Sequence, residues 1–163
     1  MLKIKPVILV EHSLCNMMEK KPKNIFVQGP IEAPFIAESI QKHSTKTGIG
    51  AHSIFLGQVR RDLIEAKAVA AIEYTTYEEM ALKQMHTIRE AIFEKYQLTC
   101  MHIYHSLGRV QAGEICLFVF TSSRHRTDAI GACEEVVERI KKELPVWGKE
   151  IFEDASYQWK ENH

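Results

Sequence analysis

The sequence has no excess of charge of either sign, no long apolar run, few cysteines and no internal repeat. Lysine and arginine total 21 in 163 residues and are balanced by 21 aspartate and glutamate residues. No broad electrostatic attraction to a nucleic-acid backbone is therefore expected. The N-terminal run "PVILV" is too short for a signal-peptide core, and no stretch approaches the length of a membrane span. We expect a soluble cytoplasmic protein that binds neither nucleic acid nor membrane.

The four cysteines, Cys15, Cys100, Cys116 and Cys133, are scattered along the chain. None forms a C-x-x-C pair, and none has a histidine nearby at metal-ligand spacing. This pattern predicts neither a zinc site nor a disulfide framework. We expect buried, reduced thiols, no metal and no cofactor.

The chain length fits one domain with a genuine core. Residues 1–23 show no clear periodicity and end in a Lys/Pro run, which is typical of an N-terminal arm. The folded domain is predicted to span residues 24–163.

Apolar periodicity within that domain predicts alternating groups of strands and helices. Residues 24–29 are typical of a strand and 33–43 of a helix, and the β-type runs 51–60 and 68–77 flank the charged connection "RDLIEAK" as two antiparallel strands. A helix follows over 77–96, with Ala81, Met85, Ile88 and Ile92 on one face, and then strands around a "GRVQAGE" turn. The order indicates an α+β domain whose helices pack on one face of a largely antiparallel sheet.

A further helix is predicted to begin near "TSSRHRTDAI" (residues 121–130) and to end at Pro145 in "IKKELPVWGKE". At 100° per residue one apolar stripe faces the sheet, and it consists of Ile130, Cys133, Val136, Val137, Ile140 and Leu144. Lys142 lies on the acidic side, four residues after Glu138, as a surface ion pair would. Lys141 lies at the border of the stripe, where its ammonium can reach a groove at the sheet edge.

Basic residues at both ends of this helix have two interpretations. A lysine near a helix C-terminus is favoured by the helix dipole alone, and His125 and Arg126 could decorate a turn whose hydroxyls cap free backbone N–H groups. However, cations at the positive N-terminus are unfavourable unless an anion compensates them, which favours a bound phosphate. Arg60 is a further local cation, close to Gly57, where backbone or ligand can approach.

Five segments in order give the sequence a resemblance to a known family. They are "FLGQVR", "IEYTTYEEMA", "HSLGRVQAGE", "SSRHRTDAI" and "IKKELPVWGKE" with its trailing "FEDASYQW". Together they resemble the large, catalytic subunit of molybdopterin synthase over nearly all of residues 24–159. The resemblance implies an α/β hammerhead fold and a homodimer that binds a small ubiquitin-like sulfur carrier, giving a heterotetramer. It also implies transfer of sulfur from the carrier's C-terminal thiocarboxylate to cyclic pyranopterin monophosphate, which forms the dithiolene of molybdopterin.

The same resemblance implies the residues of the site. Lys141 matches the family's essential lysine, and the implied substrate-binding positions are Gln58, Val59, Arg60, His125, Arg126, Gly148 and Glu150. One position departs from the pattern, because Gly148 stands where the family commonly has a second functional lysine. We hypothesise that the adjacent Lys149 swings back over Gly148 and serves as the second catalytic lysine.

One length constrains the site, because an unbroken helix from Arg126 to Lys141 is roughly 20 Å long at about 1.5 Å per residue. A small pterin cannot span that distance. Either the basic loop folds back, or a homodimer places His125 and Arg126 opposite the partner's lysine across a two-fold axis. An alternative function is a docking module that binds the carrier without turnover. Nucleic-acid binding is a third class, against which the balanced charge argues.

Overall fold

The computed structural model describes residues 22–160 and shows three helices and eight strands in the predicted class of fold. In chain order the elements are β1 (Phe26–Gln28), α1 (Ala33–Gln41), β2 (Ala51–Gln58), β3 (Leu63–Ile64), β4 (Lys67–Thr76), α2 (Glu78–Lys95), β5 (Leu98–Gln111), β6 (Ile115–Ser123), α3 (Arg126–Glu143), β7 (Val146–Phe152) and β8 (Tyr157–Trp159). Most of the predicted N-terminal arm lies outside the described residues, and the domain boundary at residue 24 stays a prediction.

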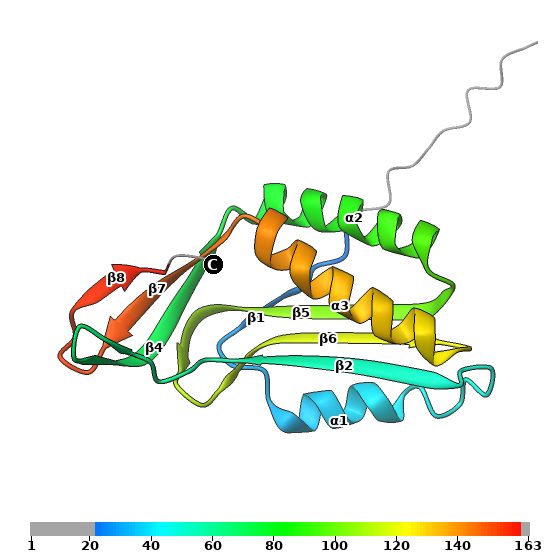
Figure 1. Ribbon diagram of the computed structural model, residues 1–163, viewed down its shortest axis with the longest axis horizontal. Helices are drawn as coiled ribbons and strands as arrows, with labels where there is room; N and C mark the ends of the chain where they lie inside the picture. The colour runs from blue at the N-terminus through cyan, green and yellow to red at the C-terminus, as the bar shows by residue number, and fades with distance from the viewer. Residues whose placement is uncertain (1–21, 161–163) are drawn as a thin grey trace, which may run out of the picture.

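The sheet is largely antiparallel, with the order β2-β6-β5-β4-β7-β8. Only the short β1 pairs in parallel, with β5, among the strands of residues 22–160. The long β5 pairs with β6 over residues 98–105 and with β4 over residues 108–111. It thereby joins the large part of the sheet to a smaller part made of β4, β7 and β8, which projects to the left in Figure 1.

The two faces of the large sheet carry different helices. Along β6, Leu117 and Val119 belong to the main core with α2 and α3, whereas Phe118 and Phe120 pack with Ile36 of α1. The alternation follows from the period of two in a strand. The two long helices, α2 and α3, pack on one face of the sheet as predicted, whereas α1 covers the opposite face (Figure 1). The continuous apolar run of β6 is the reason, because a strand buried on both faces needs cover on both.

The two long helices bury the stripes that their periodicity predicts, with one exception. The four predicted α2 residues, Ala81, Met85, Ile88 and Ile92, are all buried. On α3 the stripe is confirmed from Cys133 to Leu144, but Ile130 is 55% exposed. Ala129 and Ala132 are fully buried instead, and their small side chains let α3 approach the sheet closely. The true contact line is thus rotated slightly from the predicted one at the start of the helix.

The strands β2 and β4 run antiparallel but are not neighbours. β2 pairs with β6 at the edge of the sheet, whereas β4 pairs with β5 and β7. The charged connection between them forms the short strand β3, which pairs with β4. Its two-residue turn holds Glu65 at φ 50° and Ala66 at φ 64°. Both residues therefore adopt the left-handed conformation that glycine or asparagine adopts more readily.

We predict that Ala66→Gly raises the free energy of unfolding by about 0.5 to 1 kcal/mol, because glycine adopts positive φ without steric cost. The control is Ala71→Gly, at a regularly paired and buried position of β4, which should lower stability by at least as much because glycine weakens a strand. Urea unfolding monitored by circular dichroism measures both. A destabilised Ala66→Gly protein would contradict the strain at this turn.

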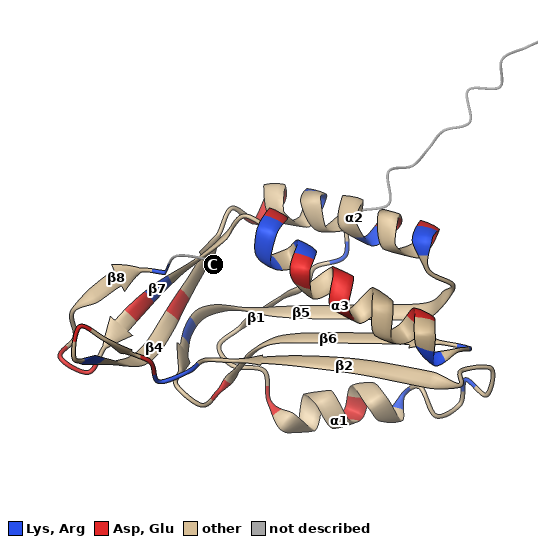
Figure 2. Ribbon diagram, viewed as in Figure 1, with Lys and Arg blue, Asp and Glu red and all other residues tan. Residues whose placement is uncertain are grey.

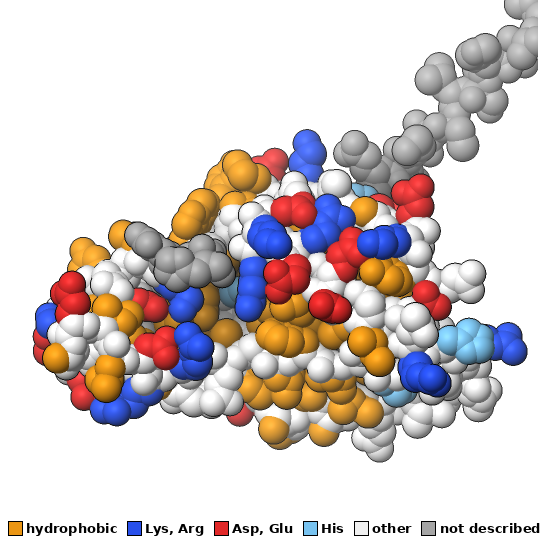
Figure 3. Space-filling model, in the orientation of Figure 1, with side chains coloured by type: hydrophobic (Ala, Val, Ile, Leu, Met, Phe, Trp, Pro, Cys, Tyr) orange, Lys and Arg blue, Asp and Glu red, His pale blue; other side chains and the backbone are white. Residues whose placement is uncertain are grey.

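Surface and thiol chemistry agree with the composition over the described residues. Acidic and basic side chains are interspersed over the α2 and α3 surface (Figure 3), and no described helix is long and apolar enough to cross a membrane. Cys100, Cys116 and Cys133 are buried free thiols, as predicted, while Cys15 lies outside the described residues. Hydrophobic side chains remain exposed along the edge strand, where Ile54 and Leu56 are 39% and 43% exposed.

Candidate functional site

A cleft of about 810 Å³ opens where the large and small parts of the sheet meet. Its walls are formed by the end of β2, the last turns of α3, the inner face of β4 and β7, and Lys160, which follows β8. Its polar and charged lining residues include Gln58, Arg60, Asp62, Tyr74, His105, Glu138, Lys141, Lys142, Glu150 and Lys160. The volume suits a small molecule, since ligand pockets commonly measure about 300 to 1,000 Å³.

Lys141 lies in the last turn of α3 and lines this cleft, as the helical spacing predicts. Its ammonium nitrogen lies 5.8 Å from the centre of the Phe55 ring on β2. Lys142 and Glu138 also border the cleft, but they make the predicted surface ion pair with each other, with the Lys142 nitrogen 3.6 Å from a Glu138 oxygen. Among the described residues no carboxylate lies within ion-pair distance of Lys141. The Lys141 ammonium is therefore free to meet an anion from outside the chain.

The end of β2 brings Gln58, Val59 and Arg60 to the rim of the cleft. Val59 is 1% exposed, and its backbone N–H donates to the Glu114 carbonyl at 3.0 Å, so it anchors the segment in the core. Arg60 extends from that anchor and donates to Asp62 Oδ2 at 3.0 Å from an exposed position. An incoming phosphate can compete for this guanidinium because exposed ion pairs contribute little.

The inner face of β7 contributes Gly148 and Glu150 to the cleft. Lys149, between them, points to the opposite face, where its ammonium lies 3.4 Å from Glu73 Oε1 and 4.7 Å from the centre of the Tyr157 ring. Successive residues of a strand face opposite sides, so Lys149 cannot follow its neighbours. Contrary to our hypothesis, the structure does not bring Lys149 into the cleft.

The floor of the cleft is formed by three titratable groups that stay neutral near pH 7. Burial raises the pKa of the Tyr74 hydroxyl and of the Cys116 thiol, and burial lowers the pKa of His105. His105 Nδ1–H donates to the Ser106 carbonyl at 2.8 Å, which leaves Nε2 as an acceptor. The thiol of Cys116 donates to the Gly57 carbonyl at 3.4 Å. A protonated, buried thiol is a poor nucleophile.

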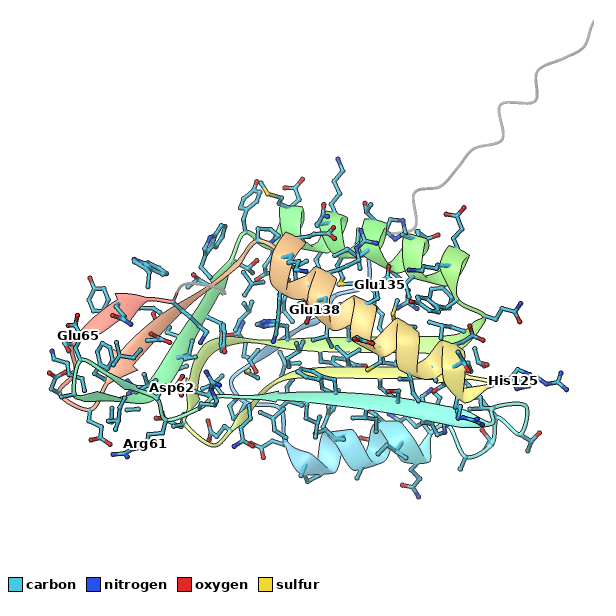
Figure 4. All side chains as sticks on the ribbon, in the orientation of Figure 1. Arg61, Asp62, Glu65, His125, Glu135 and Glu138 are labelled. Carbon is cyan, nitrogen blue, oxygen red and sulfur yellow. The ribbon has the colours of Figure 1, made fainter. Side chains whose placement is uncertain are left out.

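His125 and Arg126 lie at the opposite end of α3 from this cleft (Figure 4). Basic segments mark both ends of that helix in Figure 2. The neighbouring hydroxyls do not cap the helix, because Thr121 donates to the Ala129 carbonyl at 2.7 Å and Ser123 donates to the His125 carbonyl. No side chain caps the first turn of α3. Within one chain the structure therefore does not bring the two predicted halves of the site together.

Several cleft residues were not predicted from the sequence. The floor residues Tyr74, His105 and Cys116 lie on three different strands, and no local pattern joins them. Lys160 also lines the cleft, from the chain segment that follows β8. A signal for Lys160 did exist, because a hairpin that pairs Ile151 with Tyr157 must bring residues 148 and 160 together.

A separate cluster on the α1 side of the sheet places ring nitrogens of His43 and His102 and the sulfur of Cys100 within 4.8 Å of one another. His43 Nδ1–H donates to the Ser39 carbonyl at 2.7 Å, so its Nε2 is the acceptor for His102 Nε2–H at 3.1 Å. A hydrogen bond between the two imidazoles accounts for this geometry.

The surroundings of His102 are positively charged. Burial, and then the charges of Lys23, His43, Arg89 and Lys46, lower the pKa of His102 to about 4. The same charges disfavour a bound divalent cation. The expectation of no metal site stays a prediction.

Acidification should destabilise the fold through His102. Its pKa in the folded chain is below the ordinary 6.5, so unfolding takes up a proton and becomes more favourable as pH falls from 6.5 towards about 4. We predict that the free energy of unfolding falls over this range, and that it falls less steeply in His102→Gln protein. Urea titrations at several pH values measure the two slopes. Equal slopes would show that the imidazole is as easily protonated in the folded chain as in water.

The fold and the cleft together define a class of protein, an α+β hammerhead with a cleft lined by basic residues between the two parts of its sheet. Solved structures share it. The crystal structure of molybdopterin synthase from Staphylococcus aureus superposes with a TM-score of 0.73 and 34% identity, covering 83% of this chain and 95% of that one. A complex of subunits 1 and 2 of molybdopterin-converting factor from Helicobacter pylori shares the fold with a TM-score of 0.72 at 17% identity, covering 85% of this chain and 90% of that chain.

The MoaE protein family matches residues 31–143, and the chain belongs to this family. The molybdopterin synthase catalytic subunit of Aspergillus fumigatus is 37% identical over 121 residues, which cover 74% of this chain and 64% of that protein. The protein of the same name from Pyrococcus abyssi is 33% identical over 113 residues, covering 69% of this chain and 76% of that protein. The chain thus spans less than two thirds of the Aspergillus relative. The family resemblance seen in the sequence is confirmed.

Proposed function

We propose that this chain is the catalytic subunit of a molybdopterin synthase. It transfers sulfur from the C-terminal thiocarboxylate of a small ubiquitin-like carrier to cyclic pyranopterin monophosphate, in molybdenum cofactor biosynthesis. The observation that best supports this is a cleft that holds Lys141, which has no carboxylate partner among residues 22–160, together with the neutral groups of Tyr74, His105 and Cys116. The names of its relatives from Aspergillus and Pyrococcus agree with this activity.

The chemistry requires cations and proton transfer rather than a nucleophile on this chain. Sulfur arrives on the carrier, so Cys116 can remain a buried thiol. Lys141 can pass protons and stabilise the negative charge that develops on oxygen as sulfur replaces it on the pterin side chain. Arg60, at the rim, suits the phosphate because its planar guanidinium binds two oxygens and stays charged. Binding of the carrier's tail and of the substrate in one cleft is what the transfer needs.

We predict that Lys141→Ala lowers the rate of sulfur transfer by about 100-fold or more, in the range expected for loss of a general acid–base group. Lys142→Ala, one position along the helix and paired with Glu138, should retain most activity. The assay is conversion of cyclic pyranopterin monophosphate by purified chain with thiocarboxylated carrier.

The same assay separates this function from the alternative of a docking module. A docking module would bind the carrier with no turnover in the wild type. If Lys141→Ala protein were fully active, Lys141 would have no role in the mechanism, but the proposed sulfur-transfer activity would still be supported.

We also propose that the working form is a homodimer with composite sites, which becomes a heterotetramer when carriers bind. The edge strand β2 supports this, because it runs from the start of α3 to the cleft. Gly50, just before β2, bonds to the Ser123 carbonyl at 3.0 Å, and Gln58 at the other end lines the cleft. A two-fold axis across the middle of this strand, near the exposed Ile54 and Leu56, would set each start of α3 beside the partner's cleft.

Mixed dimers test the composite site. We predict that Arg126→Ala and Lys141→Ala proteins are each inactive alone, and that mixing them after reversible dissociation restores about a quarter of wild-type activity. This follows because half of the random pairs are heterodimers, and each of these holds one intact site of two. Mixing two differently tagged Lys141→Ala preparations is the control. No recovery, with heterodimers confirmed by mass, would place both residues in one chain's site.

Two further expectations stay proposals. A cytoplasmic location agrees with the composition, and the assembly with a carrier agrees with the two-subunit complex described for the Helicobacter pylori protein. The cleft is open at its rim, as a site that receives another protein's C-terminal tail must be.

A further inference from the structure

Lys160 faces the cleft because of the register between β7 and β8. Lys149 pairs with Trp159 and Glu150 with Gln158, so the next pair along is Gly148 with Lys160. The backbone N–H of Lys160 donates to the Gly148 carbonyl at 2.8 Å, which continues the ladder by this one pair. Residues opposite each other in an antiparallel pair point to the same face. Lys160 therefore shares the inner face with Gly148.

Gly148 leaves the space above it to Lys160. A Cβ atom built at Gly148 would lie 3.0 Å from Ile72 Cγ2, 3.5 Å from Tyr74 Cε1 and 3.7 Å from Lys160 Cβ. A side chain at position 148 would thus be crowded by Ile72, whereas the lysine side chain enters the same region from the opposite strand. The side chain of Lys160 is 33% exposed, so most of it is covered.

A buried carboxylate holds the ammonium of Lys160. Its nitrogen lies 3.4 Å from Glu150 Oε1, and Gln158 donates to Glu150 Oε2 at 2.8 Å. The Glu150 side chain is only 6% exposed, so Lys160 offsets a negative charge that would otherwise repel anions from the cleft. An ammonium has three donors, and one contact with Glu150 leaves others for a ligand.

Lys160 and Lys141 both line the cleft, and both influence the Cys116 thiol. Both positive charges lower the pKa of the Cys116 thiol, against the larger effect of burial, which raises it. The two ammonium groups come from different walls, one from the end of α3 and one from the residue that follows β8.

We propose that Lys160 is a substrate-contacting cation, which with Lys141 forms a two-ammonium site for an anionic oxygen, and that Glu150 and Gln158 hold it in place. The anion is a phosphate or a carboxylate-type terminus, both of which the proposed function supplies, and the inference rests on that function. Lys160 is thus the second lysine of the cleft, the role that Lys149 was expected to fill.

The first test compares Lys160→Met with Lys149→Met. These variants remove an ammonium from the two faces of the same small sheet, and each lysine has one carboxylate partner. We expect Lys160→Met to lower kcat/KM for sulfur transfer by about 10- to 100-fold, as for loss of a charge-assisted hydrogen bond, with partial rescue in Lys160→Arg. Lys149→Met should stay within about twofold of wild type, because its ammonium lies on the face of the small sheet that points away from the cleft. Equal activity in Lys160→Met and wild type would overturn the proposal.

A second test separates substrate contact from neutralisation of Glu150. In a Glu150→Gln background there is no carboxylate to offset, so a purely structural Lys160 would become dispensable. We expect Lys160→Met to lower kcat/KM again in that background, by about tenfold or more. If Lys160→Met lowered kcat/KM only in protein that retains Glu150, the proposal that Lys160 contacts the substrate would be overturned. Thermal unfolding of all variants confirms that each one is folded.

Binding without turnover distinguishes failure of this inference from failure of the proposed function. Inorganic phosphate and the carrier with an ordinary C-terminal carboxylate are titrated separately into the wild type and Lys160→Met by calorimetry. If Lys160→Met weakens the Kd for phosphate about tenfold or more, Lys160 contacts the phosphate. If the variant instead weakens the Kd for the carrier by that amount, Lys160 contacts the carrier's C-terminus. Unchanged affinity for both would remove Lys160 from the site. If the wild type binds these anions in a way that depends on Lys160 but transfers no sulfur, the proposed activity is refuted and the anion site that includes Lys160 is still supported.

Discussion

The antiparallel register of β7 between β4 and β8 decides which charges face the cleft. It turns Gly148 and Glu150 inward and Lys149 outward, and it brings Lys160 to the inner face. A slip of one residue would reverse all four, because side chains alternate along a strand. Pro145 contributes to this arrangement, since it ends α3 immediately before β7 and so fixes where the strand begins. The site's electrostatics are thus a property of hydrogen-bond pairing as much as of residue type.

Local periodicity explains what the sequence could predict. The buried stripe of α2, most of that of α3 and the position of Lys141 beside a groove all depend on the repeat of one helix. The separate pairing of Lys142 with Glu138 has the same origin. The positions of Gln58, Arg60 and Glu150 at the cleft came instead from the order of short segments that resemble a family.

Pairing between distant segments explains what the sequence did not reveal. The neighbour of β2 is β6 rather than β4, and nothing within either strand specifies that choice. The placement of α1 on the second face depends on Phe118 and Phe120, whose strand is apolar on both sides. Lys149 was expected in the cleft because it adjoins Gly148 in the chain, whereas a residue twelve positions from Gly148 occupies that space. In a sheet, the register of the strands decides which side chains lie close together. Residues that are adjacent in one strand point to opposite faces.

The long strand β5 has a mechanical consequence. It is hydrogen-bonded to β6 at one end and to β4 near the other, while only Leu144 and Pro145 separate α3 from β7. These two ladders and the short connection after α3 oppose separation of the two walls of the cleft. A ligand that fits the cleft would therefore bind with little rearrangement of the backbone around it.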